Sequence, residues 1–278
     1  MVYRKAGSIT AILCGRLGKG SQIVEKQIFP ILEFDASRTA KIEPSYIIKP
    51  KDVPPYCVIN YFGDVIEKRL TEGQLTKVAQ LFSATVTLPV YITQYNDQPV
   101  GIIQGYVGSA GAAAQLEELI ALGFTRFIAC GAAGTLQKGI SLGGLIIPNA
   151  AIRDEGTSYH YMPPSREARC DHAVLETIAT CLRKRHIPYV MGKTWTTDAF
   201  YRETEEKIAL RRSEGCLCVE METATYFAVS QFRNVAFGQI LYGGDDLSGI
   251  EWDSRNYNSC KDIRSKIVDL AMEICLNL

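Results

Sequence analysis

Short apolar runs alternate along the chain with longer stretches whose apolar residues recur at helical spacing. The runs are rich in valine, isoleucine and tyrosine and are bounded by turn-forming residues, which favours buried strands. We expect strands at 57–62, 90–95, 100–104, 127–130, 145–147, 189–192, 217–220 and 237–242. We expect helices at 72–84, 112–121, 171–184, 223–231 and 258–276. This alternation predicts an α/β layer fold, and Asn96-Asp97 between two runs predicts a hairpin, so that the sheet is mixed.

The first 43 residues differ from the rest because they show little periodicity and carry Gly15, Gly18 and Gly20. We therefore divide the chain into an N-terminal extension, 1–43, and one catalytic domain, 44–278. The later part has no repeat, low-complexity segment or linker. The whole chain contains 47% apolar residues, which is enough for one large core.

Charge and composition exclude several classes of protein. Lysine plus arginine and aspartate plus glutamate both number 30, so the basic excess typical of nucleic-acid binders is missing. No apolar run reaches the length of about 18 residues that spans a bilayer. The nine cysteines are scattered and contain no Cys-x-x-Cys pair, which favours a reducing cytoplasm over a disulfide scaffold. We expect a cytoplasmic protein with no nucleic-acid or membrane partner.

Two carboxylates follow the expected strand at 217–220. Alternation along a strand places Glu220 and Glu222 on the same side, with Met221 between them. The two hydroxyl groups of a sugar diol are suitable donors for such carboxylates. The alternative is a helix N-terminus, where acidic residues are favoured in any case.

Other candidate residues also follow expected strands, where ligands bind in α/β sheets. Asp245 is placed to protonate a leaving base, although Asp245-Asp246 also suits a turn or helix cap. Phe200 offers an aromatic face to a base, or fills the core. Gly131 and Ala132 start a glycine-rich segment that allows close approach of a ligand, or makes a plain turn.

The sequence lacks the motifs of several other kinds of site. The segment 15–21 lacks the glycine spacing of a phosphate-binding loop, and no Gly-x-Ser-x-Gly elbow occurs. The three histidines, His160, His172 and His186, lack metal-binding spacing, so no metal site is expected.

Taken together, these motifs resemble the nucleoside phosphorylase superfamily, which includes uridine phosphorylase, purine nucleoside phosphorylase and methylthioadenosine nucleosidase. The resemblance covers about residues 44–276. It is carried by Glu117-Glu118-Leu119, Gly131–Gly134, the segments 198–201 and 219–224, and Gly244-Asp245. It implies a three-layer α/β/α fold with a central mixed β-sheet. It also implies that relatives form dimers or hexamers in which a neighbour completes the site, so we expect a homo-oligomer.

The resemblance also implies roles for individual residues. Glu222 would hold the ribose 2′- and 3′-hydroxyls, with Met221 packed under the sugar and Glu220 in support. Phe200 would stack on the base, and Asp245 matches the acid that protonates N7 of purines. Uridine phosphorylases carry glutamine and arginine where this chain has Thr204 and Glu206, so the base site is more purine-like.

The sequence departs from the family where phosphorylases bind phosphate. The family's Gly-Asp-Pro-x-Arg loop corresponds here to Gly63-Asp64-Val65-Ile66-Glu67, and Glu67 replaces its arginine. Other phosphate ligands align with Ala129, Ala132 and Ile92. A glutamate repels phosphate, whereas in the nucleosidases a glutamate near this position activates water.

We therefore expect cleavage of the N-glycosidic bond of a nucleoside, with water favoured over phosphate, Asp245 as acid and Glu67 as base. No cofactor is expected, with phosphate as co-substrate if the enzyme is a phosphorylase. Two alternatives remain open. One is phosphorolysis, with Arg153, Arg166 or Arg202 building a different phosphate site. The other is a catalytically silent nucleoside-binding or storage protein.

Overall fold

A computed structural model describes residues 24–278 of the protein. Its strands form one ten-stranded sheet that contains both parallel and antiparallel pairs. The strands are β1 (Tyr56–Asn60), β2 (Thr76–Phe82), β3 (Thr87–Tyr95), β4 (Gln98–Gln104), β5 (Arg126–Thr135), β6 (Leu145–Asp154), β7 (Glu167–Arg169), β8 (Tyr189–Thr197), β9 (Cys216–Glu220) and β10 (Ala236–Asp246).

The order of the main strands is β10-β6-β8-β9-β5-β1-β4-β3-β2, and β10 also pairs with β5. This additional pairing closes one part of the sheet on itself. β1 is parallel to β4 and β5, and β10 is parallel to β5, whereas β5 and β9 are antiparallel. The closed arrangement brings the ends of β1, β5, β9 and β10 together around one space.

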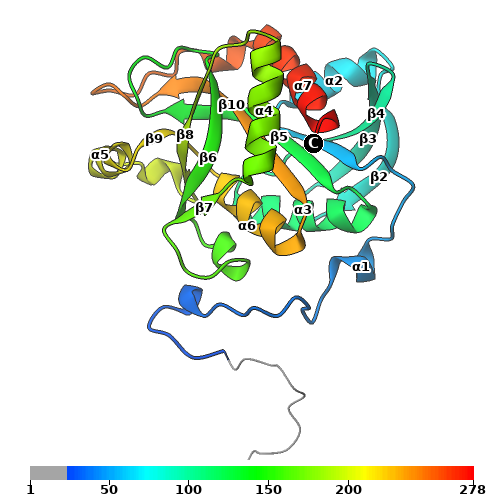
Figure 1. The fold of residues 1–278 in the computed structure, drawn as a ribbon, viewed down its shortest axis with the longest axis horizontal. Helices are drawn as coiled ribbons and strands as arrows, with labels where there is room; N and C mark the ends of the chain where they lie inside the picture. The colour runs from blue at the N-terminus through cyan, green and yellow to red at the C-terminus, as the bar shows by residue number, and fades with distance from the viewer. Residues whose placement is uncertain (1–23) are drawn as a thin grey trace, which may run out of the picture.

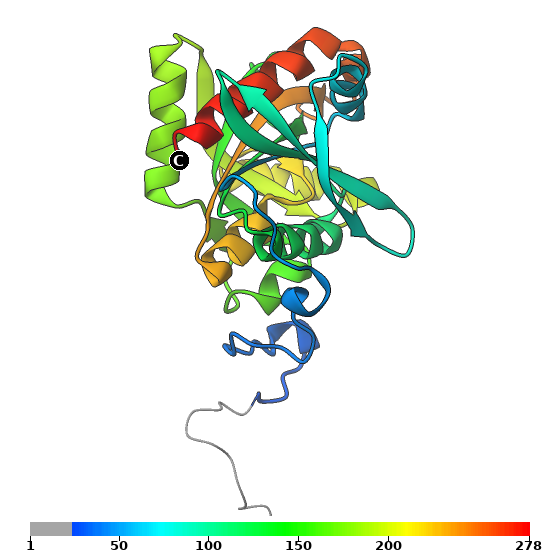
Figure 2. The ribbon, with the colours of Figure 1, turned by 90° about the vertical axis from the view of Figure 1, so that its right-hand side faces the viewer.

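The longer helices cover the sheet on two sides (Figures 1 and 2). Helices α2 and α4 each pack against α7, and α3 packs against α6 on the other side. The helices are α1 (Pro44–Ile47), α2 (Gly63–Thr71), α3 (Ser109–Leu122), α4 (His172–Lys184), α5 (Glu205–Ser213), α6 (Thr223–Arg233) and α7 (Lys261–Leu276). Short 3-10 turns η1 (Pro30–Leu32), η2 (Thr157–His160), η3 (Phe200–Arg202) and η4 (Tyr257–Ser259) complete the elements. The predicted α/β fold with a central mixed sheet is confirmed.

One predicted element is wrong. The stretch 72–84 was expected to be a helix, but Thr76–Phe82 forms strand β2, paired antiparallel with β3. The helix lies earlier, at Gly63–Thr71, and Gly73 with φ +70° follows its end. A glycine in this left-handed region interrupts the helix, and pairing with β3 then decides the conformation of the residues beyond.

The hairpin prediction is confirmed. Asn96 and Asp97 have φ values of +49° and +59° and join β3 to β4. Two successive positive φ values produce the turn that matches the twist of paired strands.

The described part of the N-terminal extension, residues 24–43, lies along the outside of the domain (Figures 1 and 2). Arg233 at the end of α6 donates a hydrogen bond of 3.1 Å to the carbonyl of Arg38, and the Arg38 guanidinium lies 4.6 Å from the ring centre of Phe232. The glycines at 15, 18 and 20 lie outside the described residues. No helix in the described part of the chain is long and apolar enough to cross a membrane.

Candidate active site

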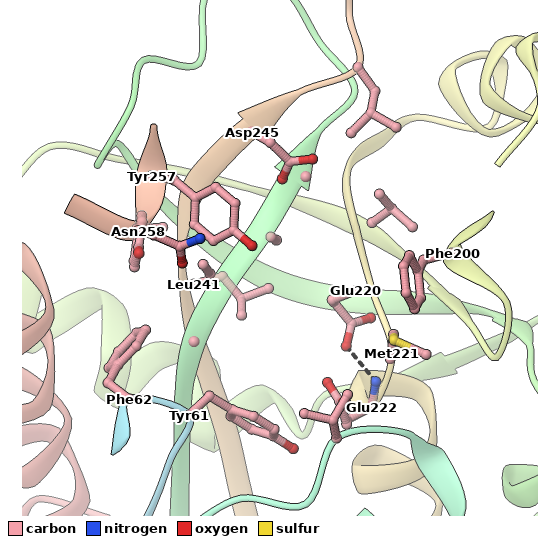
Figure 3. A pocket seen from close by; sticks show the side chains of 18 of the residues that line it. Tyr61, Phe62, Phe200, Glu220, Met221, Glu222, Leu241, Asp245, Tyr257 and Asn258 are labelled. Carbon is pink, nitrogen blue, oxygen red and sulfur yellow. Dashed lines mark hydrogen bonds between the residues drawn. The ribbon is translucent and has the colours of Figure 1, made fainter. Parts of the chain in front are cut away.

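A cavity of about 930 Å³ opens where β1, β5, β9 and β10 end. Every residue predicted for the site except Glu67 lines it, as Figure 3 shows for those labelled there. These lining residues are Gly63, Gly131, Ala132, Phe200, Glu220, Met221, Glu222 and Asp245. Gly131 and Ala132 lie within β5, whose pairing with β10 continues through them, and not in a loop beyond the strand.

Glu220 is the last residue of β9, and its carboxylate is fully engaged with the protein. One oxygen accepts hydrogen bonds from the backbone N–H groups of Glu222 (2.8 Å, dashed in Figure 3) and Thr223 (2.7 Å) at the start of α6. The other accepts from the hydroxyls of Thr196 (2.6 Å) and Thr194 (3.3 Å). Burial raises the pKa of Glu220, while these donors oppose the shift. Glu220 therefore holds the start of α6, as the helix-terminus alternative predicted.

Glu222 has a different environment, because it occupies the N-cap of α6 with φ −136° and not a strand position. It is 6% exposed, accepts a hydrogen bond of 2.6 Å from Gly108 N, and keeps its second carboxylate oxygen available to the cavity. Burial, followed by the charge of Glu220, raises the pKa of Glu222 to about 8. A buried acceptor with spare capacity is what a pair of sugar hydroxyls requires.

Groups around Glu222 keep this part of the wall in place. Ser109 at the start of α3 donates a hydrogen bond of 2.7 Å to the carbonyl of Met221. Beside it, the hydroxyls of Tyr61 and Tyr226 are 2.7 Å apart, and Tyr61 also donates to the carbonyl of Tyr106. Burial, and then the charge of Glu222, raise the pKa of both tyrosines well above the usual value. Neutral phenols therefore lie next to the Glu222 carboxyl.

The wall near Phe200 carries Asp245, on β10. Phe200 begins η3 and is 49% exposed at the cavity wall. Trp252 Nε1 donates a hydrogen bond of 2.7 Å to one oxygen of Asp245. Asp246, in contrast, accepts from Ser248 N and Thr135 and pairs with Arg255. Each of the two interpretations of the acidic pair thus applies to one residue. Asp246 stabilises the turn, and Asp245 lines the cavity.

The N-terminus of α2 contributes Gly63 and Asp64 to the cavity, together with Arg264 from α7. Arg264 Nη1 lies 3.3 Å from Asp64 Oδ1, and Nη2 donates to Asn258 Oδ1 at 3.2 Å. Glu67 lies one turn further along α2, exposed to solvent and outside the cavity lining. Glu67 is therefore not part of the cavity wall, unlike Gly63 and Asp64 at the start of the same helix.

Sequence reasoning missed several residues of the wall, namely Tyr61, Glu203, Gln239, Trp252 and Arg264. Each comes from a segment without a recognised motif, and folding brings them to the cavity. Glu203 was the most accessible to prediction, since it lies three residues after Phe200. Within residues 24–278, no cluster of three or more histidine, cysteine or acidic side chains has the arrangement needed to hold a metal ion.

Comparison with known proteins agrees with this geometry. The family model described as the phosphorylase superfamily matches residues 61–277. A guanosine phosphorylase from Halorubrum lacusprofundi is 27% identical over 225 residues, which cover 77% of this chain and 93% of that protein. The crystal structure of uridine phosphorylase from Vibrio fischeri superposes with a TM-score of 0.70 at 25% identity, covering 83% of this chain and 95% of the other. An AMP nucleosidase from Bacteroides thetaiotaomicron shares the fold, with a TM-score of 0.62 at 24% identity, 81% coverage of this chain and 90% of its own.

Fold and cavity together define an α/β protein of the nucleoside phosphorylase type. The chain belongs to the phosphorylase superfamily. The prediction of a nucleoside phosphorylase-like protein is thereby confirmed at the level of the family.

Proposed function

We propose that this cavity cleaves the N-ribosidic bond of a purine-type nucleoside. The observation that carries the proposal is the open carboxylate of Glu222, which shares one cavity with Phe200 and Asp245. Glu222 accepts hydrogen bonds from the 2′- and 3′-hydroxyls, Met221 packs under the sugar, and Phe200 stacks on the base. The names of relatives that act on guanosine and purine nucleosides support this choice.

In the proposed reaction, Asp245 gives a proton to N7 of the purine as the bond between C1′ and N9 breaks. The electron pair of that bond leaves with the base. An acceptor oxygen then bonds to C1′ on the opposite side of an oxocarbenium-like sugar. Protonation of the leaving base typically accelerates such a step by about 10²–10⁴-fold.

Water is the acceptor that we favour. The positions matching the family's phosphate ligands hold Ala129, Ala132 and Ile92, whose side chains donate no hydrogen bonds. Glu67 is exposed outside the cavity, so we move the role of base to Asp64, the carboxylate at the cavity wall on the first turn of α2. Asp64 takes the proton that water loses as its oxygen bonds to C1′.

Phosphate is the second candidate, and Arg264 is the observation in its favour. Arg264 is the cationic side chain among the residues that line the cavity within the described chain. The cations Arg153, Arg166 and Arg202, considered from sequence, do not line it. Arg153 donates instead to Ser158, Ser165 and two backbone carbonyls. A guanidinium suits a phosphate oxyanion, although Asp64 beside it repels one.

The test is to incubate the protein with purine nucleosides, with and without phosphate, and to identify the sugar released. Free ribose formed without phosphate is the expected product. Ribose 1-phosphate formed only when phosphate is present would replace water by phosphate as acceptor. In that case Arg264→Lys should lower the rate more than Asp64→Asn, and the reverse order is expected for hydrolysis. If no nucleoside is cleaved, the silent binding protein is the correct reading, and nucleosides should still raise the melting temperature.

A further inference from the structure

Glu203 lies in the same wall as Asp245 but has no assigned role. It follows η3, and its backbone N–H donates to the carbonyl of Phe200 at 3.2 Å, so the turn that presents Phe200 also fixes Glu203. Both side chains line the cavity, together with Asp245 and Trp252. The position therefore lies where the base of the proposed nucleoside binds.

The carboxylates of Asp245 and Asp154 are matched with donors. Asp245 receives the indole N–H of Trp252, and Asp154 receives Trp195, Lys207 and Arg211. The half-buried Glu203 lines the cavity together with Asp245, and within the described residues its carboxyl group receives no hydrogen-bond donor. Burial, followed by the charge of Asp245, raises the pKa of Glu203 to about 7. Glu203 therefore keeps its proton closer to neutral pH than an exposed glutamate does.

We propose that Glu203 is a specificity-determining residue which, together with Asp245, selects purines that carry an amino group at position 6. This inference rests on the proposed function of the cavity. With Asp245 as the acid of the proposed reaction, the two carboxyl groups offer one donor and, on Glu203, acceptor oxygens. The edge of a 6-aminopurine offers the complement, an acceptor at N7 beside the N6 amino donor. A 6-oxopurine presents two acceptors, N7 and O6, and requires two donors.

The arrangement also separates the tasks of the two acids. One carboxyl group of the pair carries the proton that N7 receives during cleavage. The other, ionised group accepts a hydrogen bond from the 6-amino group and so orients the base against Phe200. With a 6-oxopurine the ionised group would face O6, and two acceptors in contact without a proton between them repel each other.

The experiment compares adenosine and inosine, which differ only at position 6 of the base, as substrates of the wild type and of Glu203→Gln. The glutamine has a permanent N–H donor, so it supplies the second donor that inosine needs. We expect the wild type to prefer adenosine, and the ratio of kcat/KM for adenosine to that for inosine to fall about 10-fold or more in the variant. Glu205→Gln, at an exposed position two residues away on α5, is the matched control and should leave the ratio unchanged.

The outcomes separate this inference from the proposed function. Cleavage with a preference for inosine or guanosine, or a ratio that Glu203→Gln does not change, would overturn the role of Glu203 and leave nucleoside cleavage standing. Absence of cleavage would overturn the proposed function. The selectivity is then read from melting temperatures, where adenine should stabilise the wild type more than hypoxanthine does. Equal shifts with the two bases would reject the inference.

Discussion

Glu222 accepts a hydrogen bond of 2.6 Å from the backbone N–H of Gly108, a residue 114 positions earlier in the sequence. The contact joins the N-cap of α6 to the N-cap of α3. It fixes one carboxylate oxygen of Glu222 and leaves the other to the cavity. The geometry of the proposed ribose site therefore depends on the conformation of a glycine outside the Glu220–Glu222 motif.

Gly108 has φ +92°, a conformation that side chains rarely adopt, although its position has open space around it. We expect Gly108→Ala to lower the free energy of unfolding by about 1 kcal/mol and to weaken nucleoside binding, because relaxing the strain moves the N–H away from Glu222. Gly139 has the same φ and equally open surroundings in an exposed turn. Gly139→Ala should therefore lose similar stability and bind normally. Equal binding by the two variants would contradict this role of Gly108.

Exchange of each glutamate of the motif for glutamine should separate their roles. Glu220→Gln replaces one carboxylate oxygen with an amide group that meets N–H or O–H donors, so the start of α6 loses acceptors. We expect a loss of about 2 kcal/mol in the free energy of unfolding, measured in urea. Glu222→Gln should fold at least as well as the wild type near pH 8 while losing nucleoside affinity. Similar stability of the two variants would contradict the assignment.

The stability of the protein should depend on pH through Glu222. Its pKa of about 8 in the folded protein lies above that of a glutamate in an unfolded chain, which is about 4.3. Between these two pKa values the folded state binds a proton that the unfolded chain has released. The resulting contribution to the free energy of unfolding is fully present below about pH 4.3 and is lost as pH rises through about 8.

Glu222→Gln removes this titration. Relative to the wild type, the variant should gain on the order of 1 kcal/mol or more between pH 5 and pH 9, measured from urea unfolding at both values. The raised pKa of Glu203 acts in the same direction but is present in both proteins, so it cancels in the comparison. A stability difference that does not change with pH would show that Glu222 titrates normally.

We predict a homo-oligomer, a dimer or a hexamer, in which a neighbour completes the site. Val107, Tyr201 and Trp252 line the cavity and yet are 73%, 88% and 64% exposed in the single chain. A partner subunit over the cavity mouth would bury these side chains. Light scattering should give a mass of two or six chains, and Tyr201→Asp should reduce it. A monomer that cleaves nucleosides would show that one chain suffices.

Local patterns in the sequence predict where the strands lie better than they predict how long the strands are. The apolar runs of β5 and β10 are evident, but the glycines that follow them suggest loops. In the structure Gly131 pairs with Leu241 and Ala133 with Gly243, so both strands continue into the cavity wall. The absence of side chains at these glycines does not prevent backbone pairing, and only the partner strand decides where each strand ends.

The site likewise contains residues that a local motif reveals and residues that only contacts remote in sequence bring together. Glu220, Met221 and Glu222 are visible because they lie together at a strand end, and their different tasks depend on Thr196 and Gly108, which are remote in sequence. Glu67 was chosen by matching residues 63–67 to the family's phosphate loop. In the structure these residues belong to α2, and Glu67, three positions after the cavity-lining Asp64, is exposed to solvent. Arg264 has no local motif and reaches the cavity only because α7 packs beside α2.

The most direct test of the ribose site compares purine ribonucleosides with their 2′-deoxy counterparts in the wild type and in Glu222→Ala. The quantity measured is kcat/KM for release of the base. The wild type should prefer the ribonucleoside by about 10-fold or more, and Glu222→Ala should remove most of that preference, because the hydroxyl and the carboxylate act only together. A preference that survives in Glu222→Ala, or no release of base by the wild type, would contradict the account.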